Sequence, residues 1–423
     1  MRLKAIVSGL VSAAFTSRRR RDLMRRLQRR KGPPMLDYFH QVDDPYSHLL
    51  VQRLAALKAR YGVTIRPWLA SPPDDAAAPE RGRLQRYALG DAALVAPAYG
   101  VTFPEGACQP SAAATRDAAG RLAAALSEQD FAGVATAVGE ALWTGAALPA
   151  GGWMDPTAAL AAGDAERKRL GHYLGGMIHL EGEWYWGVDR LHHLEERLAA
   201  LGFDAAPGAP PIAPFRDLTL DAAPRPGHRP VIDVWFSFRS PYSWIAFPRV
   251  RRLAQHYGAE LRLRYILPMV MRGLPVPREK SRYIMLDTKR EADRVGLPFG
   301  KVLDPVGKGV ERSIAVLHHA VPLGLGEAFA ERILRATWSE AADLTDDGVF
   351  YGLAAEAGLS KAQVDAALAD ESWREAAEIN RQALFDAGLW GAPTYRVDGG
   401  DALWGQDRLW ALERDVRRAV GAV

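Results

Sequence analysis

The sequence predicts an α/β protein made of two similar units in tandem, each with a long helical insertion. Three observations predict this architecture: a stretch of the chain recurs at a constant offset, a proline-rich segment separates the two copies, and the second copy begins with a strand, a helix and a strand. At 423 residues, with 48% hydrophobic and 25% charged residues, the chain has room for two or three ordinary globular domains.

The repeat emerges when the chain is shifted by 196 residues, so that residues 37–103 fall on residues 233–299 without a gap. The matches include Pro45-Tyr46-Ser47 with Pro241-Tyr242-Ser243, Tyr61-Gly62 with Tyr257-Gly258, Arg86-Tyr87 with Arg282-Tyr283, and Asp91 with Asp287. Near the end of each copy, residues 186–191 echo residues 404–409. Because the matches involve many residue types in one register, they indicate a duplication.

The domain boundaries follow from this repeat. Residues 204–230 hold seven prolines, a density that cannot continue a helix or a central strand, so we expect a semi-rigid Pro-rich linker there. The expected order is a basic N-terminal arm (1–34), a first domain (35–203), the linker, and a second domain (231–423).

The elements of the second copy can be predicted in order. Residues 230–238 form a short apolar, β-branched and aromatic run, which is typical of a buried strand. Ser240 then suits the N-cap of a helix and Pro241 its first position. This helix is expected to end near Tyr257, because the next residue, Gly258, suits the position after a helix.

The order of the remaining predicted strands and helices in the second copy indicates a known fold. Residues 261–267 are predicted to be a second strand, parallel to the first. Residues 278–388 favour helices by composition, and residues 394–397 predict a strand that is followed by a short strand near Leu403 and a last helix from Gln406. This is the order of a thioredoxin fold with a helical domain spliced in.

The distribution of charge and the number of cysteines exclude some classes of function. The chain carries +4, but residues 1–34 hold eleven Lys or Arg against the single acid Asp22, so this arm carries +10 and the remainder −6. We therefore expect no nucleic-acid-binding domain. Cys108 is the single cysteine, so the chain can form neither an intrachain disulfide nor a Cys-x-x-Cys pair, which favours a cytoplasmic location. Cys108 itself lies outside any motif and is expected to be a bystander.

The basic arm contains a mildly apolar run, Ala5–Phe15, followed by the four arginines Arg18–Arg21. The run is too short to span a bilayer. Three interpretations stay open: a solvated basic arm, a helix with weak contact to an anionic membrane surface, and a signal or transit peptide. No later stretch is predicted to span a membrane.

The loop Ser240-Pro241-Tyr242-Ser243 lies between the predicted strand 230–238 and the start of the helix that follows it. Unpaired N–H groups and the helix dipole stabilise an anion such as a thiolate at that position. In thioredoxin-like oxidoreductases this loop is Cys-x-x-Cys. Here two hydroxyls replace both sulfurs, so we expect no disulfide exchange, but the Ser240 hydroxyl can donate to the sulfur of bound glutathione and lower its pKa.

Four segments together resemble the 2-hydroxychromene-2-carboxylate isomerase family, which is related to kappa-class glutathione transferases within the DsbA-like thioredoxin fold. The segments are residues 235–244, 280–287, 391–395 and 404–409. The resemblance covers about residues 230–420. With the repeat, it implies two tandem thioredoxin-like (DsbA-like) domains and glutathione as the cofactor.

The resemblance also implies a role for each matching position. Ser240 matches the catalytic serine that contacts the glutathione sulfur. Pro393 matches a cis-proline, and Ala392 before it would pair its backbone with the cysteinyl part of glutathione. Gln406 and Asp407 match the pair that holds the γ-glutamyl end. No metal site is predicted.

The family reaction is glutathione-dependent cis–trans isomerisation of a small aromatic substrate. The thiolate adds to a conjugated double bond, the resulting single bond rotates, and elimination restores the alkene. Leu274 stands at a position that is often polar in the family, which leaves the substrate open. Two alternatives remain: a kappa-like glutathione transferase that consumes glutathione with an electrophile, and a non-catalytic tandem thioredoxin-like binding module. A monomer and a homodimer are equally open.

Simpler roles also stay open for several of these residues. Ser240 could be only an N-cap, Pro393 only a turn proline, and Asp407 only a first-turn acid that complements its helix dipole. The adjacent pairs His192-His193 and His318-His319 are expected to point to different sides of a helix, which does not suit one metal ion, and are assigned structural or surface roles.

The first copy departs from this site. Asp44 stands where the second copy has Ser240, and a carboxylate would repel a thiolate. Gly176 and Val188 replace the proline and the glutamine of the second copy. We expect no glutathione chemistry in the first domain, which would serve as a scaffold or as a substitute for the second subunit of a dimer. A divergent site that uses Asp44 is the alternative.

Overall fold

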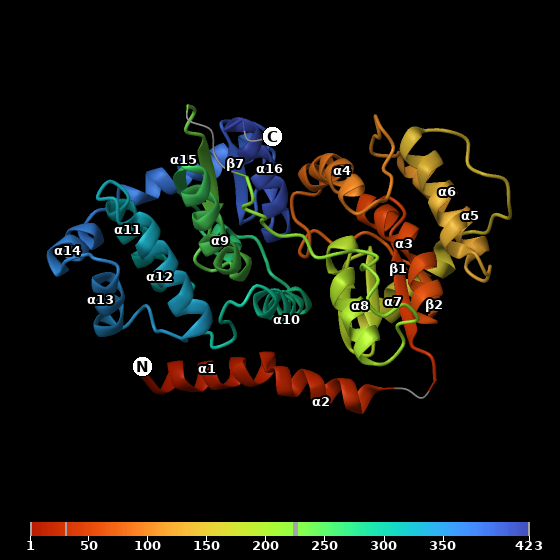
Figure 1. The fold of residues 1–423 in the computed structure, drawn as a ribbon, viewed down its shortest axis with the longest axis horizontal. Coiled ribbons are helices and arrows are strands. Elements are labelled where there is room, and N and C mark those ends of the chain that lie inside the picture. Colours follow the sequence, from red (N-terminus) through yellow and green to blue (C-terminus); the bar gives the residue numbers. More distant parts are fainter. Residues whose placement is uncertain (1, 30–31, 223–226, 422–423) are drawn as a thin grey trace. The chain divides into compact units, whose positions relative to one another are not determined.

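The protein divides into two compact units, which are described separately here (Figure 1). The N-terminal unit is Asp22–Phe215, and the C-terminal unit consists of Met1–Arg21 and Arg216–Val423. The computed structural model describes residues 2–29, 32–222 and 227–421. Parts of three predicted segments lie outside the described residues, namely residues 1 and 30–31 of the basic arm, residues 223–226 of the linker and residues 422–423 of the second domain.

The C-terminal unit is built on a four-stranded mixed sheet with the order β6-β5-β7-β8. Its strands are β5 (Val231–Phe236), β6 (Glu260–Tyr265), β7 (Thr394–Val397) and β8 (Leu403–Trp404). Strand β5 pairs parallel with β6 and antiparallel with β7, and β7 pairs antiparallel with β8. The predicted strand–helix–strand start and the two late strands are confirmed. Strand β5 is shorter than the predicted range 230–238, and β6 begins one residue and ends two residues earlier than the predicted range 261–267.

Helix α9 (Pro241–Tyr257) connects β5 to β6, and local sequence signals fix both of its ends. The Ser240 Oγ accepts a hydrogen bond from the Ser243 N–H at 3.1 Å, which caps the helix. Gly258 closes it in the left-handed conformation with φ +67°. The predicted bounds of this helix are confirmed.

Six helices form the insertion between β6 and β7, as the composition predicted. They are α10 (Arg278–Arg294), α11 (Lys308–Ala320), α12 (Gly326–Ser339), α13 (Asp347–Glu356), α14 (Lys361–Ala369) and α15 (Trp373–Asp386). Ile314, Phe329 and Phe350 of these helices are fully buried in one core with Phe236 of β5. After β8, the 3₁₀ turn η3 (Gln406–Arg408) leads into α16 (Leu409–Ala419), so the predicted last helix begins with a tighter turn.

The N-terminal unit repeats this pairing scheme. Its sheet has the order β2-β1-β3-β4, with β1 parallel to β2 and antiparallel to β3, and β3 antiparallel to β4. The strands are β1 (Met35–His40), β2 (Thr64–Leu69), β3 (Met177–Leu180) and β4 (Glu183–Trp186). The helical elements are α3 (Pro45–Tyr61), α4 (Arg81–Ala98), α5 (Ala112–Ala125), α6 (Phe131–Thr144), α7 (Thr157–Arg169), η1 (Val188–Arg190) and α8 (Leu191–Ala200).

Each central strand carries a buried aspartate, at positions related by the 196-residue offset. In β1, Asp37 accepts a hydrogen bond from the Arg66 Nε at 2.6 Å. In β5, Asp233 accepts from the Arg264 Nε at 2.9 Å and from the Arg396 Nη2 at 3.1 Å. Arginines on neighbouring strands therefore neutralise the acid in both sheets, as a buried carboxylate requires.

The linker is not a free spacer, because each unit binds one part of its backbone through a buried glutamate. Glu195 of α8 accepts hydrogen bonds from Tyr61 Oη (3.1 Å), Ile212 N (2.8 Å) and Ala213 N (3.0 Å). Glu413 of α16 accepts from Tyr257 Oη (2.9 Å), Thr219 N (2.6 Å) and Leu220 N (2.6 Å). Residues near 212 and 220 are thereby anchored, each to its own unit.

The basic arm forms two helices, α1 (Arg2–Thr16) and α2 (Arg18–Gln28). Helix α1 belongs to the C-terminal unit, where the Ser8 Oγ donates to the Val302 carbonyl at 2.9 Å. In the N-terminal unit, Arg25 of α2 makes two hydrogen bonds to Glu183, at 2.7 and 2.9 Å. Among the described residues, no helix combines the length and the apolar character needed to cross a bilayer.

Candidate functional site

Ser240 lies at the N-terminus of α9 and makes two hydrogen bonds. Its Oγ accepts from the Ser243 N–H at 3.1 Å and donates to the Ala392 carbonyl, also at 3.1 Å. The second bond joins residues 152 positions apart, so the fold brings two of the predicted site residues together. The Ser240 side chain is half-buried and still reaches solvent.

The second serine of the loop is structural. Ser243 is only 1% exposed, and its Oγ accepts a hydrogen bond from the Ser237 N–H at 3.4 Å. A ligand that approached the helix N-terminus would therefore meet Ser240 and not Ser243. The two hydroxyls of the loop therefore differ, because Ser240 is half-buried and Ser243 lies in the core.

The peptide bond between Ala392 and Pro393 is cis. The Pro393 carbonyl accepts a hydrogen bond from the Gly405 N–H at 2.9 Å, which ties the start of β7 to the turn before η3. Gly391 packs so closely on Trp404 that a Cβ there would lie 2.3 Å from the indole ring. The loop that carries Ala392 is thus held on two sides.

Gln406 is buried, with 2% of its surface exposed, and its amide is engaged on both sides. The Oε1 accepts from Arg249 Nη1 at 2.9 Å, and the Nε2 donates to Glu291 Oε2 at 2.7 Å. The Nε2 also donates to the neighbouring Asp407, whose side chain is half-buried. Gln406 therefore supports the turn in this structure, and its predicted contact with glutathione would require it to exchange these bonds.

Sequence reasoning gave no role to one residue of this site. The Tyr242 hydroxyl, in the middle of the loop, donates to Asp287 Oδ2 of α10 at 2.8 Å. Asp287 is 1% exposed and also accepts from Arg290 at 2.9 Å. This bond ties the loop to the helical insertion. The repeat carried a signal for this pair, because Tyr46 and Asp91 occupy the matching positions of the first copy. There Tyr46 donates to Asp91 at the same distance, 2.8 Å.

The equivalent position in the N-terminal unit is filled by a carboxylate. Asp44 caps α3 and accepts from the Ser47 N–H at 2.9 Å and from the Ser47 Oγ at 2.7 Å. Burial raises the pKa of Asp44 to about 6, although the Ser47 hydrogen bonds oppose the shift. Gly176 lies opposite, and a Cβ there would come within 3.0 Å of the Asp44 carboxylate.

The hydrogen bonds agree with the predicted alignment of the last parts of the two copies. The Gly187 N–H donates to the Gly176 carbonyl at 2.8 Å, as Gly405 does to Pro393 in the other unit. This places Gly176 at the proline position and Val188 at the glutamine position. Val188 is buried and offers no polar group, so the N-terminal unit lacks the amide found in the C-terminal unit.

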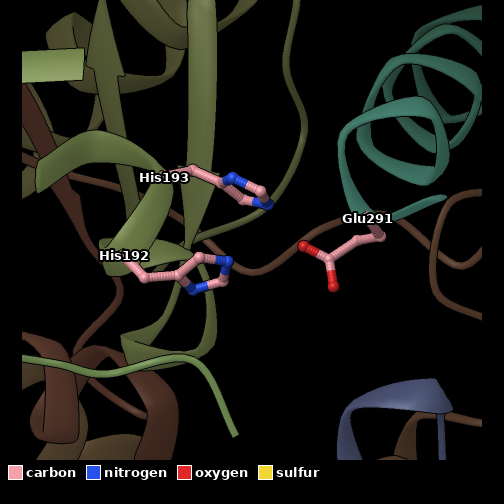
Figure 2. Close-up of side chains that lie close together, drawn as sticks. All are labelled: His192, His193 and Glu291. Carbon is pink, nitrogen blue, oxygen red and sulfur yellow. The ribbon is translucent and has the colours of Figure 1, made fainter. Parts of the chain in front are cut away.

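One of the two histidine pairs does not separate as its spacing predicted. The rings of His192 and His193, at the start of α8, lie 4.0 Å apart between centroids (Figure 2). The prediction that these two side chains point to different sides of the helix is wrong, because their rings contact each other. His318 and His319 have separate partners, Tyr265 at 2.6 Å and Asp370 at 2.8 Å. The absence of a metal site stays a prediction.

Comparison with known proteins gives the fold of the C-terminal half. Residues 231–417 match the model of the DSBA-like thioredoxin domain. A 2-hydroxychromene-2-carboxylate isomerase of Pseudomonas putida is 24% identical over 196 residues, which are 44% of this chain and 95% of that protein. A second one, of Pseudomonas sp. strain C18, is 24% identical over 194 residues, 44% of this chain and 90% of that protein.

Two solved structures are similar to about the same share of the chain. The structure of a 2-hydroxychromene-2-carboxylate isomerase is 24% identical, with a TM-score of 0.38, and covers 44% of this chain and 95% of that one. The cytosolic disulfide reductase DsbM of Pseudomonas aeruginosa is 24% identical, with a TM-score of 0.35, over 45% of this chain and 97% of that one. The C-terminal half of the chain is a DsbA-like thioredoxin domain.

Proposed function

We propose that the C-terminal unit is a glutathione-dependent cis–trans isomerase of the 2-hydroxychromene-2-carboxylate isomerase type, with Ser240 as its catalytic residue. One observation carries the proposal: the half-buried Ser240 hydroxyl caps a helix of 17 residues and lies beside the backbone of Ala392, next to the cis peptide bond. The similarity to two isomerases supports the reaction class.

The residues present suit glutathione, which would supply a thiolate as the nucleophile. The Ser240 hydroxyl now donates to a carbonyl and could turn to donate to a sulfur instead. The N-terminus of α9 would stabilise the negative charge there. The backbone of Ala392 would pair with the peptide part of glutathione, and Asp407 with Gln406 would hold its γ-glutamyl end.

Two alternatives for the same site are decided by what happens to glutathione. A kappa-like transferase would consume it with an electrophile, whereas an isomerase would return it unchanged. A non-catalytic binding module would turn over neither kind of substrate. Disulfide exchange by the protein itself would need a cysteine in the loop, and the single cysteine is Cys108.

We also propose that the N-terminal unit is a degenerate thioredoxin-like domain without glutathione chemistry. Its sheet has the same order and pairing sense as that of the C-terminal unit. Asp44 places a carboxylate where a thiolate would have to lie, and the two would repel each other. The unit would act as a scaffold in place of a second subunit.

Calorimetric titration with glutathione tests the main proposal. The wild type is expected to bind, and Ser240→Ala is expected to weaken binding at least ten-fold and to abolish isomerisation of 2-hydroxychromene-2-carboxylate. Ser360→Ala is the matched control, because Ser360 caps α14 in the same unit and its loss costs a similar amount of stability, about 1 kcal/mol. Equal glutathione affinity in the wild type and Ser240→Ala would contradict the proposal.

A further inference from the structure

Helix α1 attaches to the C-terminal unit through small and hydroxylated residues. The Ser8 Oγ donates to the Val302 carbonyl at 2.9 Å, and the Val302 N–H donates to the Ser12 Oγ at 2.8 Å. Gly9 lies on the same face, where a Cβ would come within 2.8 Å of the Ala341 side chain. An amphipathic helix ordinarily docks through its large apolar side chains, and α1 does the reverse.

Four large aliphatic side chains of α1 face solvent instead. Their exposed fractions are 57% for Ile6, 50% for Val7, 64% for Leu10 and 64% for Val11. Residues four apart lie on the same side of a helix, so these four form one continuous stripe, the α1 stripe. Four aliphatic side chains exposed together on one helix mark an interaction surface.

Arginines follow the stripe directly along the chain. Arg18, Arg19 and Arg20 are exposed, while Arg21 pairs with Asp293 at 3.6 Å. Asp22 is the single acid among residues 1–34, so the arm itself offers little negative charge to offset these guanidinium groups. The surface therefore combines aliphatic side chains with a local positive charge.

We propose that the α1 stripe and the three arginines bind the surface of a bilayer that contains anionic lipids. The aliphatic side chains would enter the boundary between headgroups and acyl chains, and the guanidinium groups would pair with lipid phosphates. With 15 residues, α1 is shorter than the roughly 20 needed to span a bilayer, so it would lie in the interface. A nucleic acid would use the arginines and leave the stripe exposed, whereas a second copy of the chain would cover the stripe.

Co-sedimentation of the full chain with vesicles tests this inference. The wild type is expected to bind vesicles of phosphatidylcholine with phosphatidylglycerol, and to bind pure phosphatidylcholine vesicles weakly. Replacing the three arginines by glutamine should weaken binding about a hundred-fold, since each contributes about five-fold near an anionic surface. The double variant Leu10→Asp with Val11→Asp should abolish binding.

Matched variants control for charge and for surface polarity. Glutamine at the exposed Arg229, Arg252 and Arg278 gives the same net charge as the first variant, and binding is expected to stay at the wild-type level. Leu323→Asp replaces a 48%-exposed aliphatic side chain of the same unit and should also have no effect. Circular dichroism confirms that each variant is folded.

A probe on the stripe reports insertion directly. A polarity-sensitive dye on Leu10→Cys, in a Cys108→Ser background, should shift to shorter wavelength with anionic vesicles, whereas the dye on Leu323→Cys should not. Vesicle binding unaffected by the aspartate variant would overturn the inference. So would a wild-type dimer that this variant dissociates, or binding to single-stranded RNA without binding to vesicles.

Discussion

Gln406→Leu separates the structural role of Gln406 from its predicted contact with glutathione. Leucine has a similar size but removes the two buried bonds, to Arg249 Nη1 (2.9 Å) and Glu291 Oε2 (2.7 Å), together with the bond to the half-buried Asp407. A hydrogen bond to a charged group contributes about 1.5–3 kcal/mol, so the two bonds together amount to about 3–6 kcal/mol. Because Arg249 also hydrogen-bonds to Asp217, we expect the lower end, about 3 kcal/mol.

The assay is urea unfolding of the full chain without glutathione, followed by circular dichroism and tryptophan fluorescence. Gln382→Leu is the control, because Gln382 is an exposed glutamine that also has its amide hydrogen-bonded on both sides, donating to Asp386 at 2.8 Å and accepting from Arg381 at 3.3 Å. Its replacement should cost less than about 1 kcal/mol, because both bonds are exposed to water. If Gln406→Leu left stability unchanged and abolished glutathione binding, Gln406 would be a direct ligand contact and the supporting role would be wrong.

Three further predictions concern single side chains. Tyr242→Phe removes the bond to the Asp287 carboxylate and should lower the free energy of unfolding by about 1.5–3 kcal/mol, measured in urea, with Ser240 and the helix cap intact. Glu413→Gln weakens the anchor of the linker and should expose residues near 220 to limited proteolysis, while the wild type resists cleavage there. Asp44→Ser should change the pH dependence of stability. The folded pKa of Asp44, about 6, lies above its usual value near 3.8, so the wild type should gain stability relative to the variant as the pH falls from about 6 to 4. Urea midpoints of both proteins at pH 7 and pH 4.5 measure this, and a constant difference would contradict the shift.

The strands and helices of the C-terminal unit could be predicted because their signals are local. An N-cap serine followed by proline and a glycine after the last turn specify α9 within about twenty residues of sequence. The segment Val231–Phe236 is apolar enough to predict a buried strand by itself. Segments of this kind need no information from distant parts of the chain.

The network around the site could not be predicted in the same way. Tyr242 and Asp287 are 45 residues apart, and nothing local relates one to the other. Gln406 and Asp407 are adjacent in the sequence, yet the first turns into the core while the second is half-buried. Which of two neighbours becomes buried depends on partners such as Glu291 that only the tertiary structure supplies.

The basic arm shows a different limit. Hydropathy identifies the apolar run Ala5–Phe15, but it suggests that the large side chains are the ones that dock. The helix docks through Ser8, Gly9 and Ser12, because close approach and hydrogen bonding to Val302 favour small residues. Composition alone does not distinguish an apolar face that is buried from one that is presented.

The two units act as an internal comparison that separates fold from chemistry. The tyrosine–aspartate bond is 2.8 Å long in both, from Tyr46 to Asp91 and from Tyr242 to Asp287, although the two loops carry different cap residues. This bond therefore stabilises the fold that the two units share and does not depend on a thiol-binding site. Among the described residues, the serine–backbone bond beside the cis-proline occurs in the C-terminal unit alone, because the N-terminal unit has Asp44 in place of the serine and a glycine in place of the proline. Replacing Asp44 by serine would restore the hydroxyl but neither the proline nor the buried amide, so the substitution should not by itself create glutathione binding.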